Sequence, residues 1–300
     1  MILSTRMKAI LALIVTGTIG GIAPLFMKIA LREFSSYQVL FIRFGLAFLF
    51  VSPLLVKNIK KLTIKNLAYI IPAGLLFSGN VFFFVVGVQY TTSIVSQLFY
   101  LLTPVIVTVV GFLLYREKIS VQRMVSMLVC FGGSSLLISR SMQGGSLIHS
   151  IGTFQGNILI ICAVFSWALY AIYTKRLSKK FEPSLFLVTN FMTALLISCV
   201  SFFITKTSIT STVMQFIHSS FPVMGSLLAL AIINSVIFFF LYQWSLKHVS
   251  AFIASLTTYL SPLSAALFAI PFFGEQLSVI LIISAVSIFA GSYLILSEKR

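Results

Sequence analysis

The side chains able to do chemistry are few, and most of them are uncharged. The chain has no Asp, only five acidic residues and three His, and its three Cys lie far apart within hydrophobic runs. Carboxylate-pair catalysis, a His-based triad and a metal site all lack the residues they require. No HExxH, Walker or nucleotide-binding glycine motif is present. The sequence therefore predicts a protein that is not an enzyme and that holds no metal or cofactor.

Uncharged polar residues form a stripe within one hydrophobic run. Ser93, Ser96, Gln97 and Tyr100 are spaced at i, i+3, i+4 and i+7, which places them on one helix face. In lipid, a polar helix face must meet protein or water, because hydrocarbon leaves its hydrogen bonds unmet. We expect Gln97 and Tyr100, and Thr258 in the matching run of the second half, to line a substrate cavity. Helix packing through small residues and hydroxyls is the alternative.

Four charged residues carry a functional hypothesis. Arg43 and Lys28 are the cations well within hydrophobic runs, where a charge is costly and indicates function. Arg43 could hold a carboxylate or phosphate by paired hydrogen bonds, although both side chains could also reach the nearby interface. Glu117 and Glu275 are expected at opposite membrane faces, close to helix starts. For these two, helix capping or gate pairing is favoured over proton coupling.

The other intramembrane candidates are uncharged. Amide donors with aromatic walls suit a neutral or zwitterionic solute. Pro104 and Pro262 are the predicted hinges, since proline bends a membrane helix. The further cavity candidates are Asn80, Tyr170, Asn190, Asn234 and Tyr242.

The elements that must position these residues are membrane helices. A chain that is 59% hydrophobic and 9% charged has lipid as its solvent. A bilayer core needs about 20 apolar residues per helix, and ten such runs are present; the first is expected to be a retained span, not a cleaved signal peptide. The predicted spans are 8–31, 37–56, 67–89, 92–115, 121–139, 155–175, 184–204, 222–246, 250–273 and 278–297.

The chain is an internal duplication. Residues 82–139 match residues 240–297 without a gap, at the offset of 158 that separates Pro104 from Pro262. An earlier match, which includes Lys28 on Lys175, has an offset of 147. The extra residues of the second half fall between Ile204 and Pro222 and are expected to form a loop. We therefore expect a first repeat at 1–140 and a second at 155–297.

Five helices per repeat is an odd number, so the second repeat should cross the membrane in the opposite direction to the first. The charges favour both termini in the cytoplasm. In that arrangement the outside segments hold only Arg32, Arg140 and Lys206 of the 21 basic residues. The net charge of +16 is then explained by basic residues in the cytoplasmic segments, and nucleic-acid binding is not expected.

These features together resemble the EamA-like branch of the drug/metabolite transporter superfamily. The resemblance is carried by Lys28, Arg43, Leu102-Thr103-Pro104 with Glu117, Ser166-Trp167-Ala168, and Leu260-Ser261-Pro262 with Glu275. It implies a ten-helix transporter with a central cavity, alternating access and small metabolites such as amino acids as substrates, and it adds Trp167 to the cavity candidates. The chain departs from the family where Gly20-Gly21 replaces a tryptophan that is often present in the first span.

The function expected from the sequence is secondary transport of small polar organic metabolites, amino acids or their relatives first, by efflux across a bacterial inner membrane. The expected partners are a small-molecule substrate and membrane lipid. The alternatives are uptake or exchange of an anionic metabolite held by Arg43, and a membrane scaffold or lipid-handling protein that does not transport. Oligomeric state and coupling ion stay open.

Overall fold

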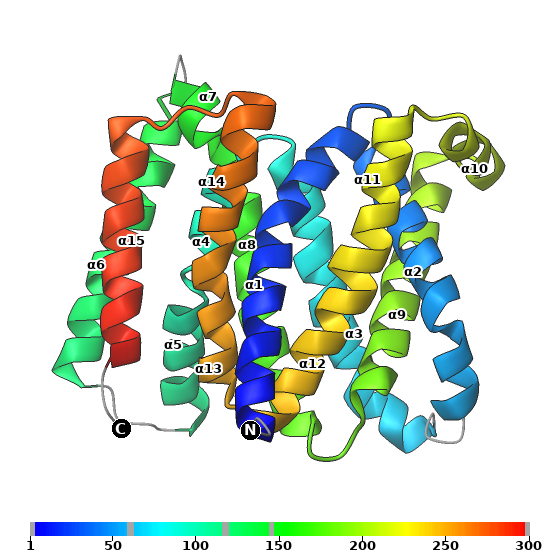
Figure 1. The fold of residues 1–300 in the computed structure, drawn as a ribbon, viewed down its shortest axis with the longest axis horizontal. Helices are drawn as coiled ribbons and strands as arrows, with labels where there is room; N and C mark the ends of the chain where they lie inside the picture. Colours follow the sequence, from blue (N-terminus) through cyan, green and yellow to red (C-terminus); the bar gives the residue numbers. More distant parts are fainter. Residues whose placement is uncertain (1–3, 59–62, 116–119, 144–146, 298–300) are drawn as a thin grey trace.

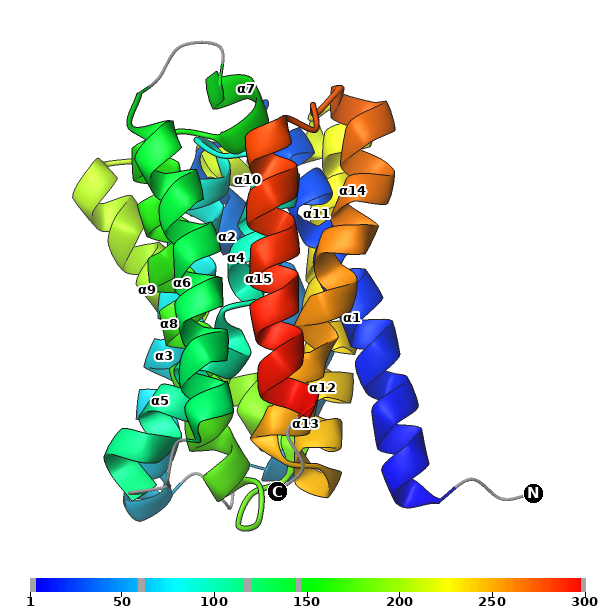
Figure 2. The same cartoon turned by 90° about the vertical axis from the view of Figure 1, so that its left-hand side faces the viewer.

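The computed structural model describes residues 4–58, 63–115, 120–143 and 147–297, and this part of the chain contains helices and no strand (Figure 1). Long helices stand side by side, and the first helix begins on the side where the last one ends (Figures 1 and 2). The first half holds α1 (Thr5–Ala30), α2 (Ser36–Asn58), α3 (Ile64–Val88), α4 (Ser93–Tyr100), α5 (Thr103–Tyr115) and α6 (Val121–Ser141). The second half holds α7 (Ile148–Ile151), α8 (Phe154–Leu177), α9 (Pro183–Thr205), α10 (Ile209–Ile217), α11 (Phe221–Ala231), the π-helix η3 (Ile232–Ile237), α12 (Phe238–His248), α13 (Ala251–Ser255), the 3₁₀ turn η4 (Leu256–Tyr259), α14 (Leu260–Phe273) and α15 (Val279–Ser297).

The surface of the bundle is apolar. Leu49, Leu113 and Phe131 are each about two-thirds exposed or more, and many other large apolar side chains also point outward. A soluble monomer rarely exposes this much apolar surface, whereas lipid solvates it. Among the described residues, eight helical segments are long and apolar enough to cross a membrane, and the predicted spans 250–273 and 278–297 contain shorter apolar helices. The chain is an integral membrane protein.

Local sequence fixes where several helices begin. The hydroxyl oxygens of Thr63, Thr92 and Thr153 accept hydrogen bonds from the backbone N–H three residues ahead, at the starts of α3, α4 and α8. Such caps satisfy donors that have no partner within the helix. The helix starts are therefore set by single hydroxyl residues placed just before each apolar run.

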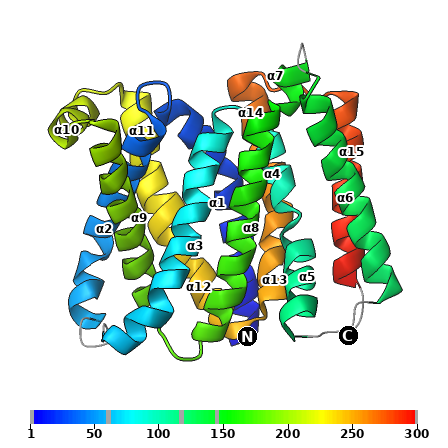
Figure 3. The ribbon, with the colours of Figure 1, turned by 180° about the vertical axis from the view of Figure 1, so that it is seen from behind.

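The helices of one half pack mainly against those of the other. The first predicted span of each half contacts the third predicted span of the other half, as α1 does with α12 and α8 does with α3. α2 packs on α9, and α1 also contacts α14 (Figures 1 and 3). The main hydrophobic core therefore lies between the two halves and is formed by residues of both.

α6 and α15 lie side by side (Figure 2), and their contact shows this exchange at the level of single residues. A Cβ added at Gly133 would lie 2.9 Å from the carbonyl oxygen of Ser284, and one at Gly291 would lie 2.6 Å from that of Ser126. The two glycines, and likewise the two serines, are 158 residues apart. A Cβ at Gly132 would meet nothing within 4 Å. The close contact is therefore made by repeat-related residues on both helices.

Within the described residues, three of the predicted spans contain a break or a change of helix type that the sequence did not indicate. The first copy of the fourth span stops at Tyr100 and restarts at Thr103, whose hydroxyl donates to the Tyr100 carbonyl at 2.6 Å. The second copy passes through the 3₁₀ turn η4. The span 222–246 contains the π-helix η3. Hydropathy counts apolar residues and does not report the hydrogen-bond pattern, so these interruptions were not predicted.

The loop predicted between Ile204 and Pro222 is wrong, because it contains the helix α10. The polar side of this helix faces the bundle, where Gln38 donates to Thr212 at 3.0 Å and to Gln215 at 3.2 Å. Its apolar residues Ile209, Val213, Met214 and Ile217 point outward. Ser and Thr suggested a loop, but an apolar face that meets lipid stabilises a helix.

Candidate functional site

A cavity of about 90 Å³ lies between the two halves, near the middle of α1, α3 and α8. Its walls also include residues of α2, α4, η3, α12, η4 and α14. Thr16, Phe84, Phe238 and Phe239 line it without having been singled out in the sequence. Seven of the ten predicted cavity residues are in the lining: Arg43, Asn80, Gln97, Tyr100, Trp167, Asn234 and Thr258.

Arg43 is the cation of the cavity. The side chain is buried, with 4% of the residue exposed. Its Nε donates to the Ser235 hydroxyl at 2.8 Å, and a terminal nitrogen donates to the Asn234 carbonyl at 3.1 Å. The guanidinium also lies 5.1 Å from the ring centroid of Phe44, a distance at which a ring face attracts a cation. It is thus held by uncharged groups at the cavity wall and does not reach the membrane surface.

The π-helix η3 supplies both oxygens that hold Arg43. In this turn the Ser235 hydroxyl donates to the Leu230 carbonyl at 2.9 Å, and the Asn234 amide donates to the Ile19 carbonyl of α1 at 2.7 Å. A π-helical turn is often found at a functional site, because it frees backbone groups from the regular ladder. Ser235 was not predicted, and its only signal in the sequence is a polar Asn-Ser pair inside an apolar run.

The predicted polar face of α4 divides into two parts. Gln97 and Tyr100 line the cavity, whereas Ser96 donates to the Ser93 carbonyl within its own helix. The Asn80 amide joins α3 to this face by donating to the Tyr100 hydroxyl at 2.6 Å, and it also donates to the Ala163 carbonyl at 2.9 Å. The cavity end of the stripe is therefore anchored to α3 and α8.

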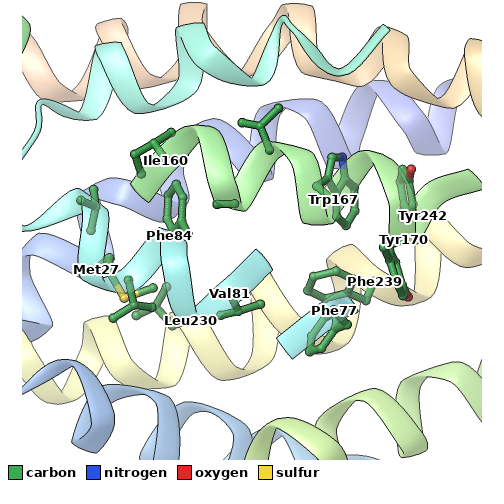
Figure 4. Close-up of a cluster of buried hydrophobic side chains, with 14 of the residues drawn as sticks. Met27, Phe77, Val81, Phe84, Ile160, Trp167, Tyr170, Leu230, Phe239 and Tyr242 are labelled. Atoms are coloured by element: carbon green, nitrogen blue, oxygen red, sulfur yellow. The ribbon is translucent and has the colours of Figure 1, made fainter. Parts of the chain in front are cut away.

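Aromatic rings form the apolar wall (Figure 4). Trp167 lies with its ring centroid 6.0 Å from that of Phe239 and 4.7 Å from that of Tyr242. Phe84 packs edge-on against Tyr100 from the other side. A solute in the cavity thus meets amides and a guanidinium on one part of the wall and rings on another.

Three predicted cavity residues lie outside the lining. Tyr170 and Asn190 belong to a buried network in which the amides of Asn190 and Gln243 donate to the Tyr170 hydroxyl at 2.6 and 2.5 Å. Tyr242 stacks on Phe238 behind the cavity wall. The hydrogen bonds of this network lie within the second half of the chain. The rings of Tyr170 and Tyr242 pack against Trp167 and support that part of the cavity wall (Figure 4).

A cluster of charged residues joins the two halves near the C-terminal end of α1. The buried Glu275 carboxylate accepts hydrogen bonds from the backbone N–H groups of Ser93 at 2.6 Å and Ile94 at 3.1 Å, and from the Lys28 ammonium at 2.9 Å. Glu275 therefore caps α4 of the first half. The helix that follows Glu275 is capped instead by Ser278. A second pocket, of about 440 Å³, borders this cluster.

The corresponding positions at the opposite side differ. Lys175, which matches Lys28 in the repeat, donates to the Leu246 carbonyl at 2.5 Å. Glu117, which matches Glu275, lies outside the described residues. The hinge candidates Pro104 and Pro262 each lie in the first turn of a helix that restarts after an interruption, α5 and α14.

Gly20 and Gly21 allow α14 to approach α1. A Cβ at Gly20 would lie 3.3 Å from both the Phe238 ring and the Ser261 hydroxyl, and one at Gly21 would meet the Ser264 side chain at 2.6 Å. A tryptophan at this place would collide with the cavity wall. Among the described residues, no group of three or more His, Cys, Asp or Glu is placed to hold a metal.

Comparison with known proteins identifies the group to which this architecture belongs. The sequence profile of the EamA-like transporter family matches residues 7–139 and again residues 154–297. The chain belongs to the EamA-like transporter family. With its apolar surface and long helices, this EamA-like protein is a membrane transporter.

Proteins similar in sequence to this EamA-like protein are also named transporters. An uncharacterized transporter of Archaeoglobus fulgidus is 24% identical over 98% of this chain and 99% of its own. Another, of Clostridium kluyveri, is 23% identical over 88% of this chain and 84% of its own. A solved crystal structure with 14% identity superposes with a TM-score of 0.64 and covers 95% of both chains, which supports the fold alone.

Proposed function

We propose that this protein is a secondary transporter of small polar organic metabolites, amino acids and their relatives first, which it moves outward by alternating access. The observation that carries the proposal is the cavity between the halves. Its wall combines Arg43, Gln97 and Asn234 with aromatic rings. Amides, one fixed charge and a ring surface are what a small polar solute needs for recognition.

The proposal includes an inverted repeat, with residues 1–140 and 155–297 as the two units. The reciprocal contacts of Gly133 with Ser284 and of Gly291 with Ser126 support it, because they relate the two units by a twofold exchange. Transporters of this kind hold their substrate where the repeats meet and expose it by rocking one repeat against the other.

A gate at the outer side is part of the same proposal. Lys28 and Ser93 of the first unit meet Glu275 of the second, so separation of the units at this face must break an ion pair and two capping hydrogen bonds. The interruptions before Pro104 and Pro262 give each unit a place at which a helix can bend.

The proposed orientation rests on the charges, and the proposed bacterial location rests on the family. The basic residues gather in the segments that share a side with both termini, which favours termini in the cytoplasm. The protein would then reside in the inner membrane and release its solute to the outside.

Comparative metabolomics of medium and cytoplasm tests the proposal. Bacteria would express the wild type, Gln97→Ala, or Gln155→Ala at matched membrane abundance, beside an empty vector. Gln155 is the control, because it is exposed at the start of α8. We expect one solute class to accumulate in the medium with the wild type and Gln155→Ala, and at least fivefold less with Gln97→Ala. Equal profiles in all four strains would contradict transport.

A further inference from the structure

The cavity holds a buried positive charge that has no acidic partner in the described part of the chain. Arg43 makes its side-chain hydrogen bonds to two uncharged oxygens. The described Glu residues are engaged elsewhere, with Ser220, Lys247 and Lys28 as their respective partners. An uncompensated charge within a membrane is costly, which makes a ligand of opposite charge the natural partner.

The geometry of the guanidinium leaves one edge open. Arginine carries five N–H donors in a planar fork. The Nε–H and one N–H of Nη2 are used by Ser235 and Asn234, the two residues of the π-helix. The other three N–H groups have no protein partner among the described residues, and two of them, one on each terminal nitrogen, lie on the edge that these nitrogens share. Two parallel N–H groups on such an edge match the two oxygens of a carboxylate.

The remainder of the wall defines what is attached to that carboxylate. Trp167 and Phe238 offer apolar ring surface. The buried Asn234 Oδ1 has no hydrogen-bond partner in the described chain and can accept from an ammonium or amide. None of the described Glu residues lines the cavity, so an organic cation would find no opposite charge there and would be repelled by Arg43.

We infer that the open edge of Arg43 binds the carboxylate of the transported solute, and that the substrates are small carboxylates, zwitterions included, rather than organic cations. This inference rests on the proposed transport function for its biological meaning. A phosphate ester carries nearly two charges at neutral pH, and a single guanidinium leaves one of them unpaired, so a carboxylate fits better.

Tryptophan fluorescence gives a direct binding test. The chain has two tryptophans, and Trp244 packs against His248 away from the cavity. The variant Trp244→Phe therefore keeps Trp167 as the single reporter in the cavity wall. The purified full chain would be titrated with acetate, butyrate and phenylacetate, with the matched amides and amines, and with phenylalanine and phenylphosphonate.

We expect at least one carboxylate or phenylalanine to bind at least tenfold more tightly than its matched amide or amine, and more tightly than phenylphosphonate. Equal affinity for carboxylate and amide, tighter binding of an amine or of the phosphonate, or no binding of any carboxylate would overturn the inference. Because this comparison uses unmutated Arg43, it does not depend on whether an Arg43 variant folds.

Two further measurements separate the inference from the transport proposal. Counterflow in liposomes would use the ligand that binds most tightly. Carboxylate-selective binding without counterflow would overturn transport and keep the site, whereas counterflow of amide and carboxylate at equal rates would keep transport and overturn the site. Arg43→Lys retains the charge but not the fork, and we expect it to lose at least tenfold in carboxylate affinity while the amide affinity stays unchanged.

Discussion

Lys28 and Arg43 are two cations within membrane helices, and they have opposite surroundings. Lys28 faces the buried carboxylate of Glu275, which also caps α4. Arg43 donates to a hydroxyl and a carbonyl oxygen and lies against the Phe44 ring, and no carboxylate among the described residues pairs with it. The first charge is compensated by the protein itself, and it ties two helices and a connecting segment together. The second charge is fixed in place but not neutralised.

This difference indicates that the charge of Lys28 serves the fold, whereas the charge of Arg43 is available to a ligand. Replacing a member of a compensated pair leaves its partner alone in a medium of low polarity, and the fold loses stability. Removing a cation that has no anionic partner relieves an electrostatic cost and should mainly affect ligands. The two regions should therefore respond to mutation in opposite ways.

The largest effect is expected from Glu275→Ala. The change leaves Lys28 without its carboxylate and the N–H groups of Ser93 and Ile94 without acceptors. We expect a loss of about 3 kcal/mol in the free energy of unfolding. Unfolding in mixed micelles, with Glu182→Ala at an exposed ion pair as the control, would measure it. If Glu275→Ala lost no more unfolding free energy than Glu182→Ala, the proposed difference between the Lys28 and Arg43 regions would be contradicted.

Arg43→Met should show the reverse pattern. An apolar side chain of similar length removes an unneutralised charge, so the free energy of unfolding should change by less than about 1.5 kcal/mol. Transport of the native substrate should fall at least tenfold, about 1.4 kcal/mol at the level of the transition state. Initial transport rates and unfolding would be measured on the same preparations. A severe loss of stability with retained transport would make Arg43 a structural residue.

Lys28→Met is expected to be milder than Glu275→Ala. The Glu275 carboxylate keeps the two backbone donors of α4 after the change. The expected loss is about 1 kcal/mol of unfolding free energy, because Lys28 is partly exposed and its charge is screened. Thermal unfolding of both variants in one detergent would rank them. The opposite order would mean that the ion pair, and not the helix cap, holds this region.

The smallest effect is expected from Ser235→Ala. Arg43 loses one of its two acceptors but keeps the Asn234 carbonyl. A neutral hydrogen-bond partner contributes about 1 kcal/mol, so substrate affinity should fall by about fivefold with little change in the maximal rate. Ser226→Ala, a serine bonded within α11, serves as the control. Equal affinities in the two variants would show that Ser235 does not orient Arg43.

Much of this could be predicted from the sequence, since lipid imposes strong rules. Ten long apolar runs, a gap-free internal match and a polar stripe on one helix face are visible without coordinates. Gln97, Tyr100 and Arg43 were selected because a polar group inside a span needs a reason to be there.

The remaining features depend on contacts between distant segments. No local signal shows that Glu275 caps a helix 182 residues earlier in the chain, or that the Asn190 amide donates to the Tyr170 hydroxyl away from the cavity. At the π-helix the Ser235 hydroxyl donates to the Leu230 carbonyl, a contact that composition does not encode. Hydropathy locates a polar residue along a span, but packing decides which way it points.

The packing of α15 on α6 has a consequence for how the protein is synthesised and inserted. α6 is synthesised long before α15, so the face of α6 at Gly133 lacks its α15 partner until the end of synthesis. The last helix described, α15, is thus the helix that covers this face of α6. A nascent chain of this protein stays an incomplete bundle through most of its synthesis, and a stop codon just before Val279 would leave α6 without the partner it packs against most extensively.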